Sequence, residues 1–100
     1  MKSLLEIVYM DKVSEIAEKI IKEQENIIGP VAVEQARKVE GIEVVSDRDI
    51  KIVGNGKEVL QNLVNQYEKL FGRASIEVCR EAVKGIISQA PRDQIPSILL

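Results

Sequence analysis

Two stretches of this chain repeat one pattern at an offset of 43 residues. Aligning residues 15–37 with residues 58–80 without a gap gives five identities and nine further positions at which both residues are apolar. The identities are Glu15/Glu58, Glu25/Glu68, Gly29/Gly72, Glu34/Glu77 and Arg37/Arg80. The shared apolar register runs through one helical segment, a glycine and a second helical segment. The pattern predicts two similar helical hairpins; the alternative is that two amphipathic helix pairs with glycine corners resemble each other for physical reasons alone.

The first hairpin begins with a long amphipathic segment. Between residues 4 and 28 the apolar residues recur at spacings of three and four, and Glu and Lys fill the other face. This spacing predicts one helix, either continuous or bent near Asp11. Gly29 and Pro30 should end it, because glycine suits the position after a helix and proline suits the first turn of the next one. A short second helix is expected to follow and to end before Gly41.

The periodicity then changes from helical to alternating, which predicts a β-hairpin with its loop at residues 46–49. One register places four apolar side chains on the same face, by pairing Ile42 with Ile52 and Val44 with Ile50. That register also sets Glu43 opposite Lys51 on the other face. Because an isolated two-stranded hairpin is marginal in water, we expect it to lie against the helices, to pair with another copy, or both.

The second helical hairpin follows a glycine-rich turn. Asn55, with Glu58 three residues later, is typical of a helix start. Gly72 divides this third helix from a fourth, which we expect to extend towards Pro91. The apolar face of the fourth helix comprises Ile76, Cys79, Val83, Ile86 and Ile87. The fold class is therefore α+β and predominantly helical, in the order ααββαα, as a single domain over residues 1–100 with an apolar tail at residues 91–100.

Composition narrows the classes of function. The net charge is −2, with basic and acidic residues interspersed, and the chain has no histidine and one cysteine. Histidine is the commonest general base and neutral metal ligand, and a single cysteine completes neither a disulfide nor a zinc site. We therefore expect no enzyme activity, no cofactor and no metal. An unpaired Cys79, no secretory-signal pattern and no run near the roughly 18 apolar residues of a membrane span favour a soluble cytoplasmic protein.

The glycine corners share one feature with the helix-hairpin-helix motif, in which backbone N–H groups at a glycine-rich turn meet DNA phosphates. That motif needs two glycines around an apolar residue, whereas each corner here has a single glycine preceded by two large apolar residues. Acidic residues near both corners offset the few basic ones. Nucleic-acid binding by the two corners is the alternative function, and the composition argues against it.

A repeated Glu-x-x-Arg sequence is the candidate polar site. Side chains three residues apart are neighbours on a helix, and such an ion pair stabilises by a few tenths of a kcal/mol. Two independent surface pairs are the interpretation that the spacing favours. If the two halves face each other, the four side chains would instead converge on one site, formed by Glu34, Arg37, Glu77 and Arg80.

The main functional prediction is a non-catalytic interaction or regulatory module that forms a homodimer or binds a protein partner. A chain of this length buries only about 60–70% of its unfolded surface, so self-association would add stability. Four of the last six residues are large and aliphatic, and we expect them to fold onto their own helices or to dock on a second subunit. The candidate dimer contacts are Ile42, Val44, Ile50, Ile52, Ile95, Ile98 and Leu99.

Overall fold

The computed structural model describes the backbone of residues 4–46 and 49–100, and the side chains of residues 12–46 and 49–100. Asp47 and Arg48, in the predicted hairpin loop, lie outside these ranges. The elements follow the order ααββαα, which confirms the predicted fold class. Their bounds are α1 Leu4–Ile28, α2 Val31–Arg37, β1 Ile42–Ser46, β2 Asp49–Ile52, α3 Gly56–Phe71 and α4 Ala74–Val83. Three single 3-10 turns follow, at Ile87–Gln89, Arg92–Gln94 and Ser97–Leu99.

The two glycine corners share a positive φ and the same pattern of backbone hydrogen bonds. Gly29 and Gly72 have φ values of 76° and 83°, in the left-handed region that a residue without Cβ adopts at little cost. Each glycine N–H donates to the carbonyl four residues earlier at 2.8 Å, and each glycine carbonyl accepts from the N–H three residues later, at 3.0 and 3.1 Å. Each corner thus ends a long helix and reverses the chain into a shorter one. We call them the first corner (Gly29) and the second corner (Gly72).

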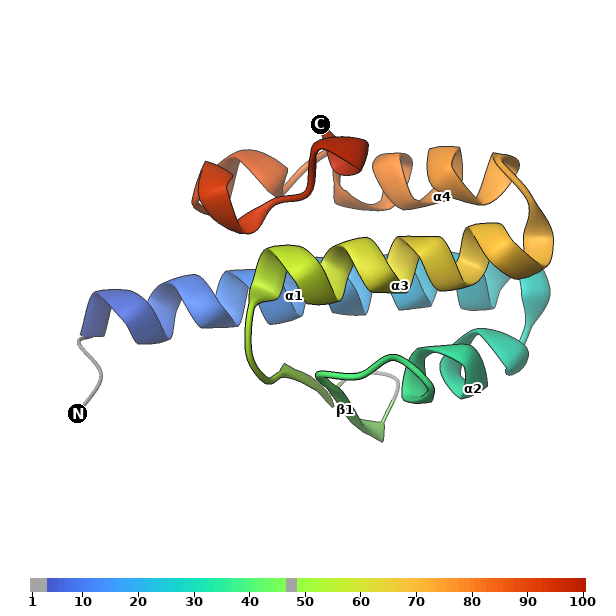
Figure 1. Ribbon diagram of the computed structural model, residues 1–100, viewed down its shortest axis with the longest axis horizontal. Helices are drawn as coiled ribbons and strands as arrows, with labels where there is room; N and C mark the ends of the chain where they lie inside the picture. Colours follow the sequence, from blue (N-terminus) through green and yellow to red (C-terminus); the bar gives the residue numbers. More distant parts are fainter. Residues whose placement is uncertain (1–3, 47–48) are drawn as a thin grey trace.

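The two long helices lie side by side and run in the same direction, and each short helix returns along the outside (Figure 1). In this view α4 and the C-terminal tail lie above the α1–α3 pair, whereas α2 and the hairpin lie below it. Both corners lie at the same end of the molecule. Rotation by half a turn about the long axis would therefore bring one helical hairpin near the position of the other.

The core repeats the internal symmetry of the sequence. Positions 43 residues apart are buried in pairs, and the pairs are Ile16/Val59, Ala17/Leu60, Ile20/Leu63, Ile21/Val64, Ala32/Ser75 and Ala36/Cys79. The long helices contribute mostly large residues to these pairs, with Ala17 as the exception, and the short helices contribute small ones. Small residues let α2 and α4 approach the central pair closely, which excludes water from the interior. Five of the nine apolar pairs shared by the two halves are therefore buried in both.

The β-hairpin has the predicted register. Ile42 pairs with Ile52, Glu43 with Lys51, and Val44 with Ile50, followed by an irregularity between Val44 and Ser46. The apolar face lies against α1 and α2, so the hairpin is covered by helices of its own chain. Side chains from these helices also bind the strand edges. Glu18 accepts from the N–H of Ile50 at 3.3 Å, and Arg37 donates to the carbonyl of Val44 at 2.9 Å.

The fourth helix is shorter than the sequence predicted. It ends at Val83, and the chain turns through Gly85 before the 3-10 turn that begins at Ile87. A glycine inside a helix lowers its stability by about 1 kcal/mol relative to alanine. Ending the helix near Gly85 therefore sacrifices little stability. Ile86 and Ile87 still pack against the core, although they are outside the helix that was expected to carry them.

Candidate functional site

A pair of equivalent buried hydrogen bonds joins the halves near their corners, beside a weaker bond from Gln24 to Sγ of Cys79 at 3.5 Å. The Tyr67 hydroxyl of α3 donates to the carbonyl of Ala32 in α2 at 2.7 Å. The Gln24 amide of α1 donates to the carbonyl of Ser75 in α4 at 3.1 Å. Tyr67 is 43 residues after Gln24, and Ser75 is 43 residues after Ala32, so the two bonds are equivalent. Each long helix is thereby fixed to the short helix of the other half, which holds the two corners together at one end of the molecule.

Four large apolar side chains are exposed at that end. Ile27 is 62% exposed and Val31 is 38% exposed at the first corner; Leu70 is 46% and Phe71 41% exposed at the second. We call these four residues the corner face. They occur at this end because the buried stripes of α1 and α3 finish at Gln24 and Tyr67, and the next turn projects past the packed helices. The corner face combines apolar residues from both halves.

The free charges around the corner face differ in sign between the two corners. Glu23 and Glu34 are exposed beside the first corner, and Lys69 and Arg73 are exposed beside the second. Within residues 12–46 and 49–100, none of these four takes part in an ion pair. The first corner thus presents unpaired acidic groups, and the second presents two exposed unpaired basic groups beside the half-buried Glu68.

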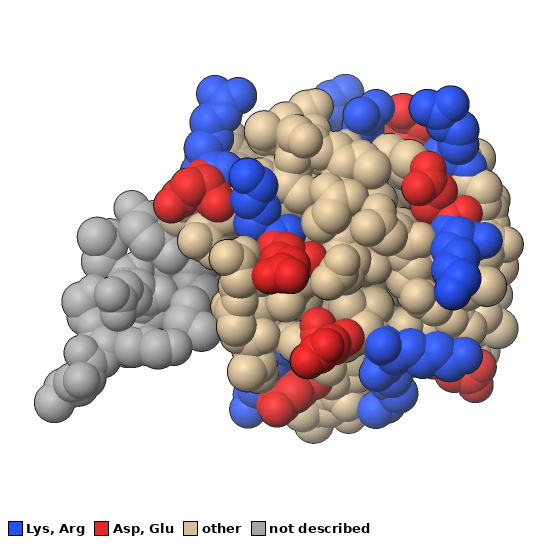
Figure 2. Space-filling view, viewed as in Figure 1, with Lys and Arg blue, Asp and Glu red and all other residues tan. Residues whose placement is uncertain are grey.

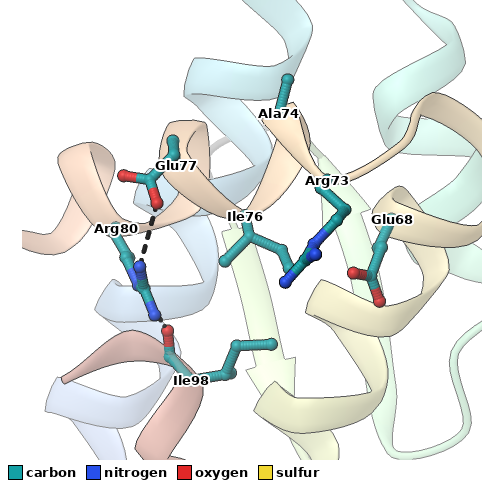
Figure 3. A pocket seen from close by; sticks show the side chains of 7 residues that line it. All are labelled: Glu68, Arg73, Ala74, Ile76, Glu77, Arg80 and Ile98. Atoms are coloured by element: carbon teal, nitrogen blue, oxygen red, sulfur yellow. Dashed lines mark hydrogen bonds and ion pairs between the residues drawn. The ribbon is translucent and has the colours of Figure 1, made fainter.

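A surface hollow of about 590 Å³ lies beside the second corner, lined by Glu68, Arg73, Ala74, Ile76, Glu77, Arg80 and Ile98 (Figure 3). Arg80 donates to Glu77 at 2.9 Å and to the backbone carbonyl of Ile98 at 2.8 Å. Arg73 points across the hollow towards Glu68. Arg80 therefore ties α4 to the C-terminal tail, and two of its N–H groups are bonded within the chain.

The predicted polar residues do not share one site. Glu34 and Arg37 belong to α2, and Glu77 and Arg80 belong to α4, on opposite sides of the α1–α3 pair (Figure 1). Glu77 and Arg80 form the expected surface ion pair. Arg37 binds the hairpin at the carbonyl of Val44, as Arg80 binds the tail. The two arginines thus have matching structural roles, each tethering the segment that follows its helix.

Most of the predicted dimer contacts are buried within the chain. Ile42, Ile50, Ile52, Ile95 and Leu99 are each at most 8% exposed, and Val44 and Ile98 are partly buried against the core. The tail folds onto its own helices, which was one of the two alternatives that the sequence left open. The sequence-based reasoning instead missed the corner face. Its signal was the pair of large apolar residues before each glycine, which helical periodicity assigned to the core stripe.

Among residues 12–46 and 49–100, the Cys79 thiol and the Tyr67 hydroxyl are buried, and burial favours their protonated forms. Burial raises the pKa of the Cys79 thiol to about 11, against the opposing effect of the hydrogen bond from Gln24. Burial also raises the pKa of Tyr67, and the nearby Cys79 and Glu25 raise it further. A thiol held protonated is a poor nucleophile and a poor metal ligand. Cys79 therefore serves as a small residue of the core.

Several backbone N–H groups at the corners are already hydrogen-bonded, so they are not free to bind a phosphate. The N–H groups of Gly29, Ala32 and Val33 donate to carbonyls of the chain, and those of Gly72, Ser75 and Ile76 do the same. The face drawn in Figure 2 carries basic and acidic residues in alternation, with no large patch of one sign. Neither feature favours the nucleic-acid alternative, which stays a prediction.

Comparison of this chain with protein-family models, characterised proteins and solved structures found no significant match. None of the helices in residues 4–46 and 49–100 combines the length and the apolar character that a membrane span requires. Over the same described part of the chain, no three Cys, Asp or Glu residues gather as metal ligands would.

Proposed function

We propose that this protein is a non-catalytic interaction module that acts as a homodimer. The observation that supports the proposal is the corner face: Ile27, Val31, Leu70 and Phe71 are each exposed beside one of the two corners, and both corners lie at the same end of the molecule (Figure 1). Contiguous exposed apolar side chains that are rimmed by charged groups mark sites of association in soluble proteins. Covering these side chains removes apolar area from water, at about 25 cal/mol per Å².

The dimer we propose is a weak one. Four partly exposed side chains cover much less than the roughly 800 Å² per partner of a standard interface, so neighbouring polar residues complete the contact. We expect a dissociation constant in the range of about 1–100 µM. The free energy gained by burying this small apolar area exceeds the free-energy cost of association by only a modest amount. An equilibrium of that strength makes the assembly sensitive to protein concentration.

Sedimentation equilibrium tests the proposal. The full chain is measured from about 1 to 300 µM in low and in moderate salt, and a dimer should accumulate across this range. Circular dichroism in parallel reports whether the chain is folded throughout. A folded protein that sediments as a monomer at every concentration contradicts the homodimer.

A further inference from the structure

We infer that two copies of this chain pair through the corner face crosswise, with the first corner of each copy on the second corner of the other. This inference rests on the proposed homodimer and identifies its contact surface and orientation. It replaces the hairpin and the tail as candidate contacts, because most of their apolar side chains are already buried within the chain.

The internal symmetry makes the corner face suited to a copy of itself. The closed pairing of two identical chains is isologous: residue i of one copy contacts residue j of the other, and the reverse contact follows. The apolar side chains come from both corners at one end of the molecule (Figure 1). When two such ends meet, each corner can face either its own counterpart or the opposite corner.

The charges decide between these two arrangements. Residues 22–37 contain two basic and three acidic side chains, for a net charge of −1. The equivalent residues 65–80 contain three basic and two acidic side chains, for a net charge of +1. The exposed groups without an ion pair reflect this difference: Glu23 and Glu34 belong to the first corner, and Lys69 and Arg73 belong to the second, where Arg73 points towards the half-buried Glu68.

Like-with-like pairing would bring Glu34 of one copy towards Glu34 of the other, and Arg73 towards Arg73. Crosswise pairing brings each acidic corner to a basic one at both contacts. Charge juxtaposition across an interface selects orientation and excludes arrangements with like charges opposed. This complementarity is a property of the chain towards itself, and it is the reason for assigning a second copy, rather than a different protein, to the corner face.

Two charge-reversed variants test the orientation. The acid-reversed variant carries Glu23→Lys and Glu34→Lys, so both of its corners are basic. The base-reversed variant carries Lys69→Glu and Arg73→Glu, so both of its corners are acidic. All four side chains are exposed, and circular dichroism checks that each variant folds. The matched control, Lys57→Glu with Lys84→Glu, changes the net charge as the base-reversed variant does but at exposed positions outside the corners.

Sedimentation equilibrium at low salt measures each variant alone and an equimolar mixture of the two. We expect each reversed variant to self-associate at least about tenfold more weakly than the unmodified chain, because both contacts become like-charged. The mixture should recover the association to within about threefold, as a heterodimer, and the control should dimerise as the unmodified chain does.

The outcomes separate this inference from the proposed function. If the unmodified chain is a monomer, the homodimer itself is wrong. If it dimerises and the reversed variants dimerise equally well, or the mixture shows no recovery, the dimer stands and the crosswise corner interface is overturned.

Discussion

Gln24 and Tyr67 occupy equivalent positions in the two halves, and each donates a buried hydrogen bond to the backbone of the opposite half. Gln24 is 1% exposed and Tyr67 is fully buried, so neither group could find water in place of its partner. Among the described residues, no buried side-chain nitrogen or oxygen lacks a hydrogen bond. This exchange of contacts makes the two helical hairpins one cooperative unit.

Removing the Tyr67 hydroxyl should therefore weaken the whole fold. We expect Tyr67→Phe to lower the free energy of unfolding by about 1–2 kcal/mol, because the carbonyl of Ala32 is left buried without its donor. Gln24→Leu should lower the free energy of unfolding by a similar amount, because the buried carbonyl of Ser75 loses its donor. Urea denaturation followed by circular dichroism measures both. Gln61→Leu is the matched control: its hydrogen bond to Asn65 lies at the surface, and a change within about 0.5 kcal/mol is expected. A Tyr67→Phe protein as stable as the original would contradict the role assigned to the bond.

Three glycines distinguish backbone strain from steric contact. A Cβ at Gly72 meets no atom within 4 Å, so Gly72→Ala should cost only the backbone strain of φ 83° with ψ −177°, about 1–3 kcal/mol. At Gly41, which also has a positive φ, a Cβ would lie 2.6 Å from Cγ2 of Val59 and 2.8 Å from the carbonyl of Val53. Gly41→Ala should therefore cost about 1–3 kcal/mol more than Gly72→Ala.

Gly85→Ala provides the control for both, because Gly85 has no positive φ and no atom within 4 Å of an added Cβ. It should leave the free energy of unfolding within about 0.5 kcal/mol. Thermal and urea unfolding give the order of the three variants. Equal costs at Gly41 and Gly72 would show that steric contact contributes nothing at Gly41.

Cys79 should make the stability depend on pH in alkaline solution. The pKa of its thiol is raised from 9.0 to about 11 on folding, so the folded chain holds its proton more tightly than the unfolded chain. The associated stability is fully present below pH 9 and is lost as the pH rises towards 11, by about 3 kcal/mol at most. Urea denaturation from pH 8 to 10.5 measures the loss, and Cys79→Ala removes the contribution of the thiol while keeping those of other groups. Parallel stability curves for the two proteins would rule out the raised pKa.

Arg80 should hold the C-terminal tail against α4. Arg80→Ala removes the donor to the carbonyl of Ile98, and we expect local opening of the tail to become easier by about 1 kcal/mol. Hydrogen exchange at the N–H groups of Leu99 and Leu100 should then be about fivefold faster. Glu77→Gln is the control, because it removes the ion pair and leaves the bond to Ile98 in place. Unchanged exchange in the Arg80→Ala protein would show that the tail is held by its apolar side chains alone.

The hairpin register and the corners were predictable because their causes are local. Alternation of apolar residues leaves one register in which Ile42, Val44, Ile50 and Ile52 share a face, and the structure has that register. Gly29 and Gly72 adopt positive φ as helix-ending glycines commonly do. The end of α4 was harder to place, since the apolar spacing continues through Ile86 and Ile87 after the helix has stopped.

The sequence by itself determined the order of the elements, the equivalence of the two halves and the face that each element buries, because periodicity and glycine chemistry act over a few residues. Only the tertiary structure decided which apolar residues remain in water. Ile27, Leu70 and Phe71 continue the stripes that fill the core, yet they lie about one turn beyond Gln24 and Tyr67, the last buried residues of α1 and α3, and are exposed. The tail has a similar composition and is buried, because α4 and Arg80 provide a place for it. Whether a side chain is buried depends on where the neighbouring elements end. The sequence of a single segment does not contain that information.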